Sequence, residues 1–350
     1  MCTCEEQEYT VRDAIDAAIF RGEFEDTWRK FLFRVAAQER ADELELELDE
    51  SAISAAAEEF RYQHDLITAE ETEGWLASRR LTLEDFSDYF ARRYCAGIVP
   101  EGFSPEKIEY NSADSELREL FVAELILSGE LEEMTTKLMW RLAARRAGEE
   151  VTPNAVAAEK ESFFERNAVT PAQLEKWLGR LGRDVKWFDE MLALEAGYRR
   201  CCETLLVPQA RQRELAMLRI PLTRMEMEVI ELESRDTAQE ALFCVREDGM
   251  SMEEVAAQGG YPYRRADFVL EDVAPEARQR FLSVSAGGFL GPFARGDGFE
   301  LCRIIRKIEP QADDPMVKSR IDRRLLASHF SELTSGYVKQ RLGAIASSAE

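Results

Sequence analysis

Two nine-residue stretches decide the fold of this sequence: TAEETEGWL at residues 68–76 and TPAQLEKWL at residues 170–178. In each, a glutamate or glutamine stands three residues after the threonine, which is the pattern of a capping box at the start of a helix. Trp75 and Trp177 each follow their threonine by seven residues, and a phenylalanine follows each tryptophan by eleven. These matched spacings indicate a repeat of helices and predict that both tryptophans lie on buried helix faces.

The similarity extends outward from these stretches. IFRGEFE at residues 19–25 matches ILSGELE at residues 126–132. Apolar residues recur at every third and fourth position through the first 210 residues, which predicts helices almost throughout. The stretch ELELELD at residues 43–49 alternates like a strand, but a polar helix or a connecting loop fits it equally well.

Breaks in this pattern predict the domain boundaries. We expect one helical copy over residues 1–97, a linker rich in turn-forming residues over 98–114, and a second copy over 115–210. After Pro208 the pattern changes to short strands and helices, which predicts a small α+β module over residues 220–310. A helix is expected over residues 311–350. The predicted fold class is therefore mainly α with a small α+β module.

The order of elements within residues 220–310 is specific. A strand candidate at 225–232 is followed by two helices that begin at Ser234 and Ser251. A short extended piece, a helix that starts at Pro275, and two strands joined by the turn RGDG at 295–298 complete the module. This order is strand, helix, helix, strand, helix, strand, turn, strand.

Charge and composition limit the classes of partner. The chain has 350 residues and a net charge of −23, with 45% hydrophobic and 32% charged residues. Such an acidic body repels nucleic acids and anionic membranes, so neither is expected as a partner. The sequence has no apolar run long enough for a membrane helix, and its first residues do not resemble a secretion signal. We therefore expect a cytoplasmic protein.

The seven cysteines give no strong sign of a metal or of disulfides. An odd number of cysteines without an export signal predicts free thiols. Cys2 and Cys4 form a C-x-C pair, but neither His64 nor His329 is close to it in the sequence, so no metal site is expected. No nucleotide-binding, serine-hydrolase or zinc-protease motif is present, and no cofactor is expected.

Three segments of the α+β module carry a resemblance to a known family. ELESRDTAQEA at residues 231–241 is similar to the first strand and alanine-rich helix of parvulins, the PpiC-type peptidyl-prolyl isomerases. MSMEEVA at 250–256 is similar to their second helix, and GFLGPF at 288–293 with GFEL at 298–301 to their last hairpin. The helical copies resemble the SurA-like chaperone domain that precedes such modules. A tandem pair of these copies is a departure from the family pattern.

This resemblance implies a function in handling peptides. The segment from residue 58 to residue 86 looks like that of cytoplasmic SurA/PpiC-type proteins associated with the maturation of ribosomally synthesised peptides. The implied partners are a peptide or an unfolded polypeptide, including a precursor peptide and its modifying enzyme. The two catalytic histidines of the family map near Val229 and onto Glu300, so the catalytic site is expected to be degenerate.

A binding groove can persist without catalytic residues. Five phenylalanines of the module are candidates to line it, although we expect most of them to be core residues: Phe268, Phe281, Phe289, Phe293 and Phe299. Arg264 and Arg265 are expected to be a solvated pair, and binding of a peptide carboxylate is the alternative.

Three functions remain open from the sequence. The first is a peptide-binding chaperone or accessory factor with a degenerate parvulin-like module. The second is an active peptidyl-prolyl isomerase whose pocket shape does most of the work. The third is a scaffold subunit of a peptide-modifying enzyme complex, in which the helical copies are docking surfaces.

Overall fold

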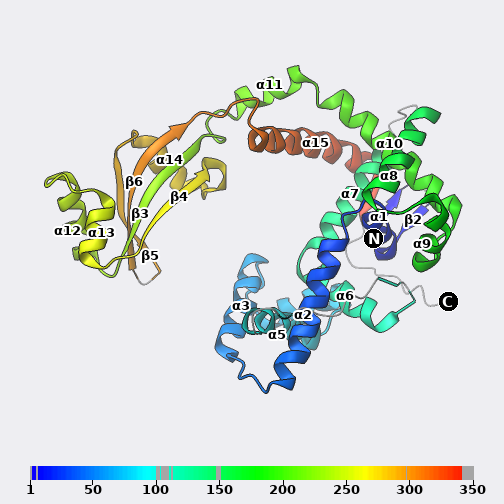
Figure 1. Ribbon diagram of the computed structural model, residues 1–350, viewed down its shortest axis with the longest axis horizontal. Coiled ribbons are helices and arrows are strands. Elements are labelled where there is room, and N and C mark those ends of the chain that lie inside the picture. Colours follow the sequence, from blue (N-terminus) through cyan, green and yellow to red (C-terminus); the bar gives the residue numbers. More distant parts are fainter. Residues whose placement is uncertain are drawn as a thin grey trace. The chain divides into compact units, whose positions relative to one another are not determined.

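The computed structural model describes residues 2–4, 7–99, 103, 110–111, 113–146, 151–296 and 298–340, with only the backbone at 2–4, 7 and 336–340. The chain forms two compact units, which are described separately (Figure 1). A helical unit comprises Met1–Thr204 with Ser328–Glu350, and a sheet unit comprises Leu205–Ala327. Within the described residues, no helix combines the length and the apolarity needed to cross a membrane.

The helical unit contains two successive sets of five helices, as the matched spacings predict. The first set is α1 (Val11–Phe20), α2 (Glu25–Glu43), α3 (Glu50–Gln63), α4 (Ala69–Ser78) and α5 (Leu83–Ile98). The second is α6 (Ser115–Leu127), α7 (Glu130–Arg146), α8 (Pro153–Arg166), α9 (Leu174–Leu181) and α10 (Val185–Leu205). The stretch at residues 43–49 is the end of α2 and a connecting loop.

Local geometry supports the repeat. Glu71 accepts a hydrogen bond of 2.8 Å from the Thr68 backbone N–H, and Gln173 accepts one of 2.9 Å from that of Thr170, so both predicted capping boxes form. Matching turns precede α2 and α7, where Gly22 and Gly129 have φ of +69° and +77°. Glycine is favoured there because it alone adopts this backbone conformation without steric cost.

The two tryptophans differ in burial. Trp177 is 6% exposed, as predicted. Trp75 also lies on the core-facing side of its helix, as predicted, but it is only half-buried. It packs at the edge of the core cluster around Phe60, and the Arg79 guanidinium lies 3.9 Å from its ring centroid. The stacked guanidinium therefore covers part of the ring that the core does not.

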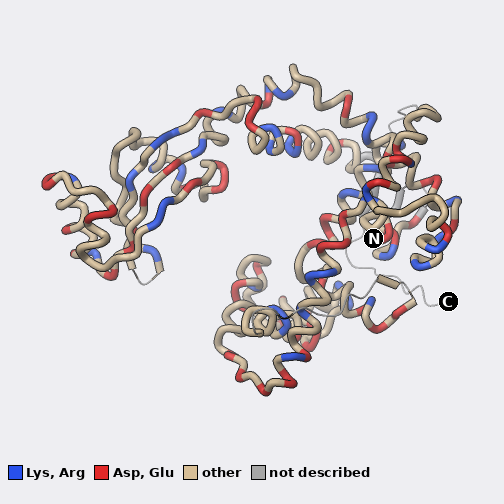
Figure 2. The backbone as a smooth tube through the Cα atoms, in the orientation of Figure 1, with Lys and Arg blue, Asp and Glu red and all other residues tan. Residues whose placement is uncertain are grey.

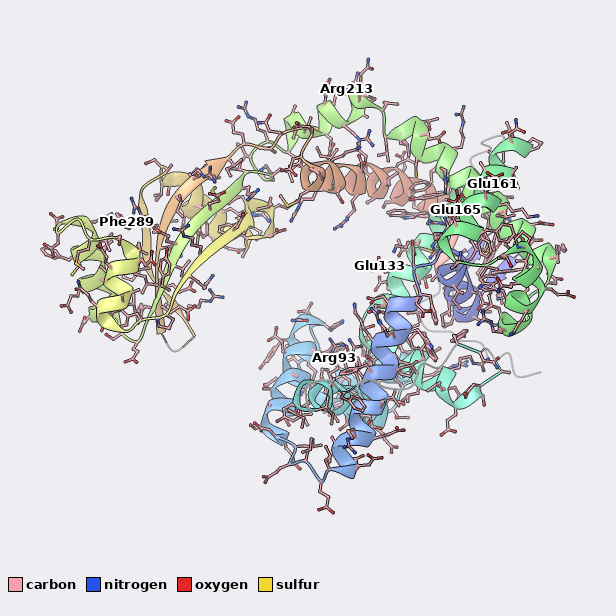
Figure 3. The ribbon with its side chains drawn as sticks, in the orientation of Figure 1. Arg93, Glu133, Glu161, Glu165, Arg213 and Phe289 are labelled. Carbon is pink, nitrogen blue, oxygen red and sulfur yellow. The ribbon has the colours of Figure 1, made fainter. Side chains whose placement is uncertain are left out.

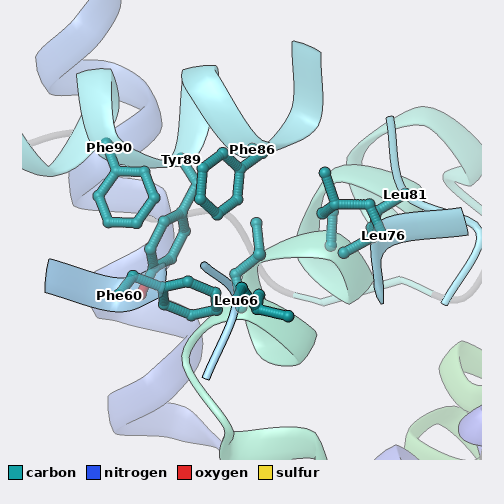
Figure 4. Packing of buried hydrophobic residues seen from close by; sticks show 9 residues of the cluster. Phe60, Leu66, Leu76, Leu81, Phe86, Tyr89 and Phe90 are labelled. Carbon is teal, nitrogen blue, oxygen red and sulfur yellow. The ribbon is translucent and has the colours of Figure 1, made fainter. Parts of the chain in front are cut away.

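The two copies exchange their first helices, which the sequence did not indicate. Phe20 of α1 packs against Phe163 and Phe188 of the second copy, with ring centroids 4.8 and 5.7 Å apart. Conversely, Ala123 and Leu127 of α6 complete the core of the first copy. The rest of that core comes from α3–α5 and the loops between them (Figure 4): Phe60, Leu66, Leu76, Leu81, Phe86, Tyr89 and Phe90. The boundary predicted between the two copies thus separates α6 from α3–α5, although these helices share one core. It separates α1 from the second copy in the same way.

A three-stranded sheet joins the ends of the described chain. β1 (Cys2–Cys4) lies between β2 (Gln7–Tyr9) and β7 (Val338–Gln340) and pairs antiparallel with both. These two short strands are exceptions to the helices that the sequence predicts almost throughout the first 210 residues. The helix expected over 311–350 is α15 (Pro315–Tyr337), which gives way to β7, and residues 341–350 lie outside the described part.

The sheet unit has the predicted order of elements. After α11 (Pro208–Met217) follow β3 (Arg224–Leu232), α12 (Arg235–Arg246), α13 (Met252–Gly259), β4 (Tyr263–Val269), α14 (Pro275–Ser283), β5 (Phe289–Arg295) and β6 (Gly298–Ile308). The four strands form an antiparallel sheet in the order β4-β3-β6-β5. The predicted fold class, mainly α with a small α+β module, is confirmed. Acidic and basic residues are interspersed along both units (Figure 2).

Alternation along β3 gives the sheet two different faces. Ile230 and Leu232 pack with residues of α12 and α13, including Ala238 and Met252. These two helices begin at Ser234 and Ser251, whose side chains accept hydrogen bonds from backbone N–H groups, as predicted. The opposite face carries Val229 and is described next.

Candidate functional site

Val229 lies at the centre of the sheet face opposite α12 and α13. It pairs in register with Arg264 on β4 and with Cys302 on β6. Its side chain is fully buried in an apolar cluster with Met227, Leu290, Cys302 and Ile304. The part of β3 to which the family resemblance assigns a histidine thus has a packed core residue at Val229.

Three half-exposed aromatic side chains surround this cluster. Phe268 from β4, Phe281 from α14 and Phe293 from β5 pack against it. The rings of Phe268 and Phe281 meet edge to face, with centroids 5.3 Å apart. The Arg280 guanidinium lies 5.7 Å from the centroid of Phe293. We call this surface, formed by Phe268, Phe281 and Phe293 around the buried cluster, the aromatic face.

The other two candidate phenylalanines do not belong to this surface. Phe289 and Phe299 pack with the cluster under α12 and α13, on the opposite face (Figure 3 labels Phe289). Phe289 and Phe293 are four residues apart, so regular alternation would place them on one face. The register between β5 and β6 shifts between Leu290 and Phe293, which places their side chains on opposite faces.

Glu300 is held by two arginines beside the aromatic face. It pairs across the sheet with Phe293, and its side chain is only 13% exposed. Its Oε1 accepts a hydrogen bond of 2.9 Å from Arg264 and another from Arg295. Arg264 also contacts Glu231 at 3.2 Å. Arg264 is thus not simply a solvated cation, because it bridges two carboxylates.

Arg265 differs from its neighbour. Its side chain is exposed and donates to the Tyr263 hydroxyl at 3.4 Å. The alternation of β4 could have separated the two arginines at the sequence level, since adjacent strand residues point to opposite faces. The partnership of Arg264 with Glu300 depends on the pairing of β3 with both neighbours, for which the sequence holds no local signal.

Among the described residues, neither a histidine nor an exposed thiol lies on this face. Cys302 is 2% exposed, and burial raises the pKa of its thiol to about 12. Both histidines of the chain lie in the helical unit. The His64 ring stacks on Phe60 with centroids 4.0 Å apart, and His329 Nε2 lies 3.7 Å from Cys201 Sγ. The aromatic face is therefore chemically suited to apolar contact rather than to proton transfer.

The described residues offer no metal centre. No group of three or more histidine, cysteine, aspartate or glutamate side chains among them is placed to hold an ion. The side chains of Cys2 and Cys4 lie outside the described part. The five cysteines whose side chains are described are free thiols: Cys95, Cys201, Cys202, Cys244 and Cys302.

Comparisons with known proteins found similar chains only among solved structures. No family model matches the sequence, and no curated protein matches it. Solved structures that are similar to it include PrsA and SurA-like proteins. Peptidylprolyl isomerase PrsA from Bacillus anthracis is 15% identical, with a TM-score of 0.32, and the match covers 58% of this chain and 94% of that one.

Two further structures belong to the same group. PrsA from Bacillus cereus is 11% identical, with a TM-score of 0.37 and coverage of 66% of this chain and 90% of that one. The SurA-like chaperones PEB4 and Cj1289 of Campylobacter jejuni give a match of 10% identity and TM-score 0.21, covering 60% and 81%. These are proteins of the kind that the sequence motifs resemble.

Proposed function

We propose that this chain is a peptide-binding chaperone or accessory factor whose sheet unit binds extended apolar polypeptide at the aromatic face without efficient prolyl isomerisation. One observation carries the proposal. The face keeps three half-exposed aromatic rings around an apolar centre, while Val229 and an arginine-paired Glu300 stand where the family resemblance expects histidines. The PrsA and SurA-like proteins, described as foldase and chaperones, are consistent with such a role.

The loss of catalysis follows from the chemistry of the amide. Rotation about an X–Pro bond must overcome a barrier of roughly 20 kcal/mol. The side chain of Val229 can neither donate nor accept a hydrogen bond. The Glu300 carboxylate already accepts hydrogen bonds from Arg264 and Arg295. Removing one preorganised donor from a catalytic site costs about 100–1,000-fold in rate. Peptide binding is less affected, because it depends on apolar contact and on strand pairing.

The charge of the chain bears on its partners. A net charge of −23 favours basic segments in a bound polypeptide and opposes self-association. The resemblance to proteins of ribosomal-peptide maturation suggests a precursor peptide, together with its modifying enzyme, as the partner in the cytoplasm. Co-purification with a short peptide would support this assignment, and capture of only a large protein would favour the scaffold function.

The proposal is tested by measuring turnover and binding on the same peptides. Protease-coupled isomerisation of a proline tetrapeptide should be undetectable, whereas fluorescence should report binding of a labelled apolar peptide. Phe293→Ala should weaken this binding severalfold. Phe243→Ala, a side chain of α12 that is 59% exposed, is the matched control and should not change it.

Two outcomes would reject the proposal. Turnover similar to that of an ordinary parvulin would establish an active isomerase. Absence of both turnover and peptide binding would leave the scaffold function as the better explanation.

A further inference from the structure

The strand β4 forms one edge of the four-stranded sheet (Figure 1). It pairs with β3 on its inner side, in an antiparallel register that runs without a shift from Tyr263 to Val269. Within the described part of the chain, no strand pairs with its outer side. An edge of this kind presents backbone N–H and C=O groups with which a further strand can pair.

Two backbone hydrogen bonds show which groups of β4 point outward. The N–H of Glu231 donates to the C=O of Pro262, and the N–H of Leu270 donates to the C=O of Thr223, both at 3.0 Å. In an antiparallel ladder, pairs that exchange hydrogen bonds alternate with pairs that do not. Counted from either end, the same alternate residues of β4 have their N–H and C=O groups directed away from β3. They are Tyr263, Arg265 and Asp267.

These outward backbone groups are free. None of them forms a hydrogen bond with a residue that the structure describes. Arg265 and Asp267 are exposed, and Tyr263 is half-buried. Alternate residues of a strand lie about 6.6–6.8 Å apart, which is also the spacing of the pairing groups of a second strand. The edge can therefore accept about five residues of an extended chain in register.

The other edge of the sheet is less suited to pairing. In β5, Pro292 has no N–H, and the register with β6 shifts between Leu290 and Phe293. Such irregularities are a common protection of sheet edges against pairing with another chain. The strand β4 contains neither proline nor glycine. Of the two edges, β4 is thus the one that is open to a further strand.

The free edge is continuous with the aromatic face. Phe268, whose ring belongs to that face, is a residue of β4. Ala266 lies two residues before it and packs against the same apolar cluster. A strand beside β4 would place every second side chain next to these two residues and the others on the opposite side. Apolar contact and backbone pairing can therefore act on the same segment of a ligand.

We propose that an extended polypeptide segment binds as a further strand along the free edge of β4, with alternate apolar side chains beside Phe268. This proposal rests on the proposed function, to which it adds the backbone contacts. The segment belongs to another protein rather than to a second copy of this chain, because a net charge of −23 opposes the association of two copies. Since the hydrogen bonds join backbones, the edge selects an extended, alternating pattern and excludes proline at the pairing positions.

The test compares backbone-methylated forms of one peptide on the full chain. The parent peptide is fluorescein-labelled, end-blocked Gly-Thr-Phe-Thr-Val-Thr-Phe-Gly, and fluorescence anisotropy measures its binding. With the apolar residues on the aromatic face, the threonine N–H groups point toward β4 and those of the apolar residues point away from it. N-methylation of the threonines should therefore weaken binding at least about tenfold more than N-methylation of the apolar residues, a difference of about 1.4 kcal/mol.

Arg265→Pro tests the edge from the side of the protein. Proline at this position lacks the outward N–H, while the hydrogen bonds between β4 and β3 do not involve that group, and edge strands accept proline. This variant should weaken binding about threefold or more. Arg265→Ala is the matched control, because it removes the same side chain, keeps the N–H, and should leave binding within about twofold. The methylated peptides are measured on the unaltered protein, so their result does not depend on folding of a variant.

The outcomes separate this proposal from the proposed function. Equal binding of the two methylated peptides would overturn the strand pairing and leave apolar binding at the aromatic face in place. Loss of the difference between Arg265→Pro and Arg265→Ala would overturn it as well. Binding that still depends on threonine methylation but is unchanged by Phe268→Ala would keep the edge and reject apolar contact at the aromatic face. No binding of the parent peptide would reject both.

A second copy of the chain is the remaining occupant that the experiment must exclude. Sedimentation of the unaltered protein should show no dimer at the concentrations used for binding. A dimer that Arg265→Pro abolishes and Arg265→Ala retains would overturn the proposal, because it would assign the free edge of β4 to self-association.

Discussion

The Asp16 carboxylate of α1 accepts a hydrogen bond of 2.6 Å from Nε of Arg183, which follows α9 in the other helical copy. Asp13 accepts a second bond from the same guanidinium at 2.7 Å. The exchange in the other direction has a counterpart, because the buried Glu124 of α6 lies 3.7 Å from Arg92 of the first copy. Each exchanged helix thus has a buried acidic residue that lies next to an arginine of the other copy.

Asp16 should make stability depend on pH. Burial, only partly opposed by Arg183 and Arg12, raises the pKa of Asp16 from 3.8 to about 6. The folded state therefore binds this proton more tightly than the unfolded chain, so the contribution of Asp16 to stability is largest below about pH 4 and is lost as the pH rises through 6. A shift of this size corresponds to about 3 kcal/mol.

Urea unfolding of the parent and of Asp16→Asn at pH 4 and pH 7 measures this effect. The stability of the parent relative to the variant should fall by up to about 3 kcal/mol between the two pH values. Every other titrating group is present in both proteins, so its effect cancels in the difference between them. The same pH dependence in both proteins would show that Asp16 is not buried as an exchanged acid.

The two matching glycine turns should respond differently to alanine. Both have positive φ, where a side chain costs about 1–2 kcal/mol. At Gly22 the added Cβ would also lie 2.9 Å from Cγ of Arg166, whereas nothing lies within 4 Å at Gly129. Gly22→Ala should therefore lower the free energy of unfolding more than Gly129→Ala. A larger loss for Gly129→Ala would contradict the geometry of the α1–α2 turn.

Phe20 should contribute to the stability of the core of the second copy. Its ring is fully buried against Phe163 and Phe188, so Phe20→Ala should cost about 3–5 kcal/mol. Its ring also meets Trp187 edge to face at 6.1 Å, which makes the fluorescence of that tryptophan a local reporter. A change in folding of the first copy alone, with the Trp187 signal unaltered, would argue against the exchange.

Cys302 should resist alkylation in the folded protein. With its thiol pKa raised to about 12 by burial, roughly one molecule in ten thousand carries the thiolate at pH 8. Iodoacetamide followed by peptide mapping should label the half-exposed Cys244 and leave Cys302 unmodified until urea is added. Equal labelling of both in the native protein would mean that the centre of the aromatic face is open to solvent.

Features set by a few neighbouring residues were predictable from the sequence. The capping boxes at Thr68 and Thr170 formed because cap and partner are three residues apart. The order of elements in the sheet unit followed from hydrophobic periodicity and from turn residues, which act over similar distances.

Features that depend on distant pairing were not predictable. The exchange of α1 and α6 swaps helices between two similar cores, and either arrangement satisfies the same hydrophobic pattern. The register shift that separates Phe289 from Phe293 follows from how β5 meets β6, so the number of residues between the two gave the wrong face. For the same reason, the sequence did not predict that Arg264 and Arg295 bind Glu300, because it does not indicate which strands are neighbours in the sheet.

The exchange of helices also sets an order of events during synthesis. Phe163, the first of the aromatic partners of Phe20, follows it by 143 residues. At 5–20 residues per second, α1 emerges roughly 7–30 s before α8 exists to receive it. Until then, the nascent chain displays an amphipathic helix whose apolar side has no place to pack. A protein that we propose to bind apolar segments of other chains thus exposes one of its own during synthesis, and we expect it to need the protection of chaperones at the ribosome.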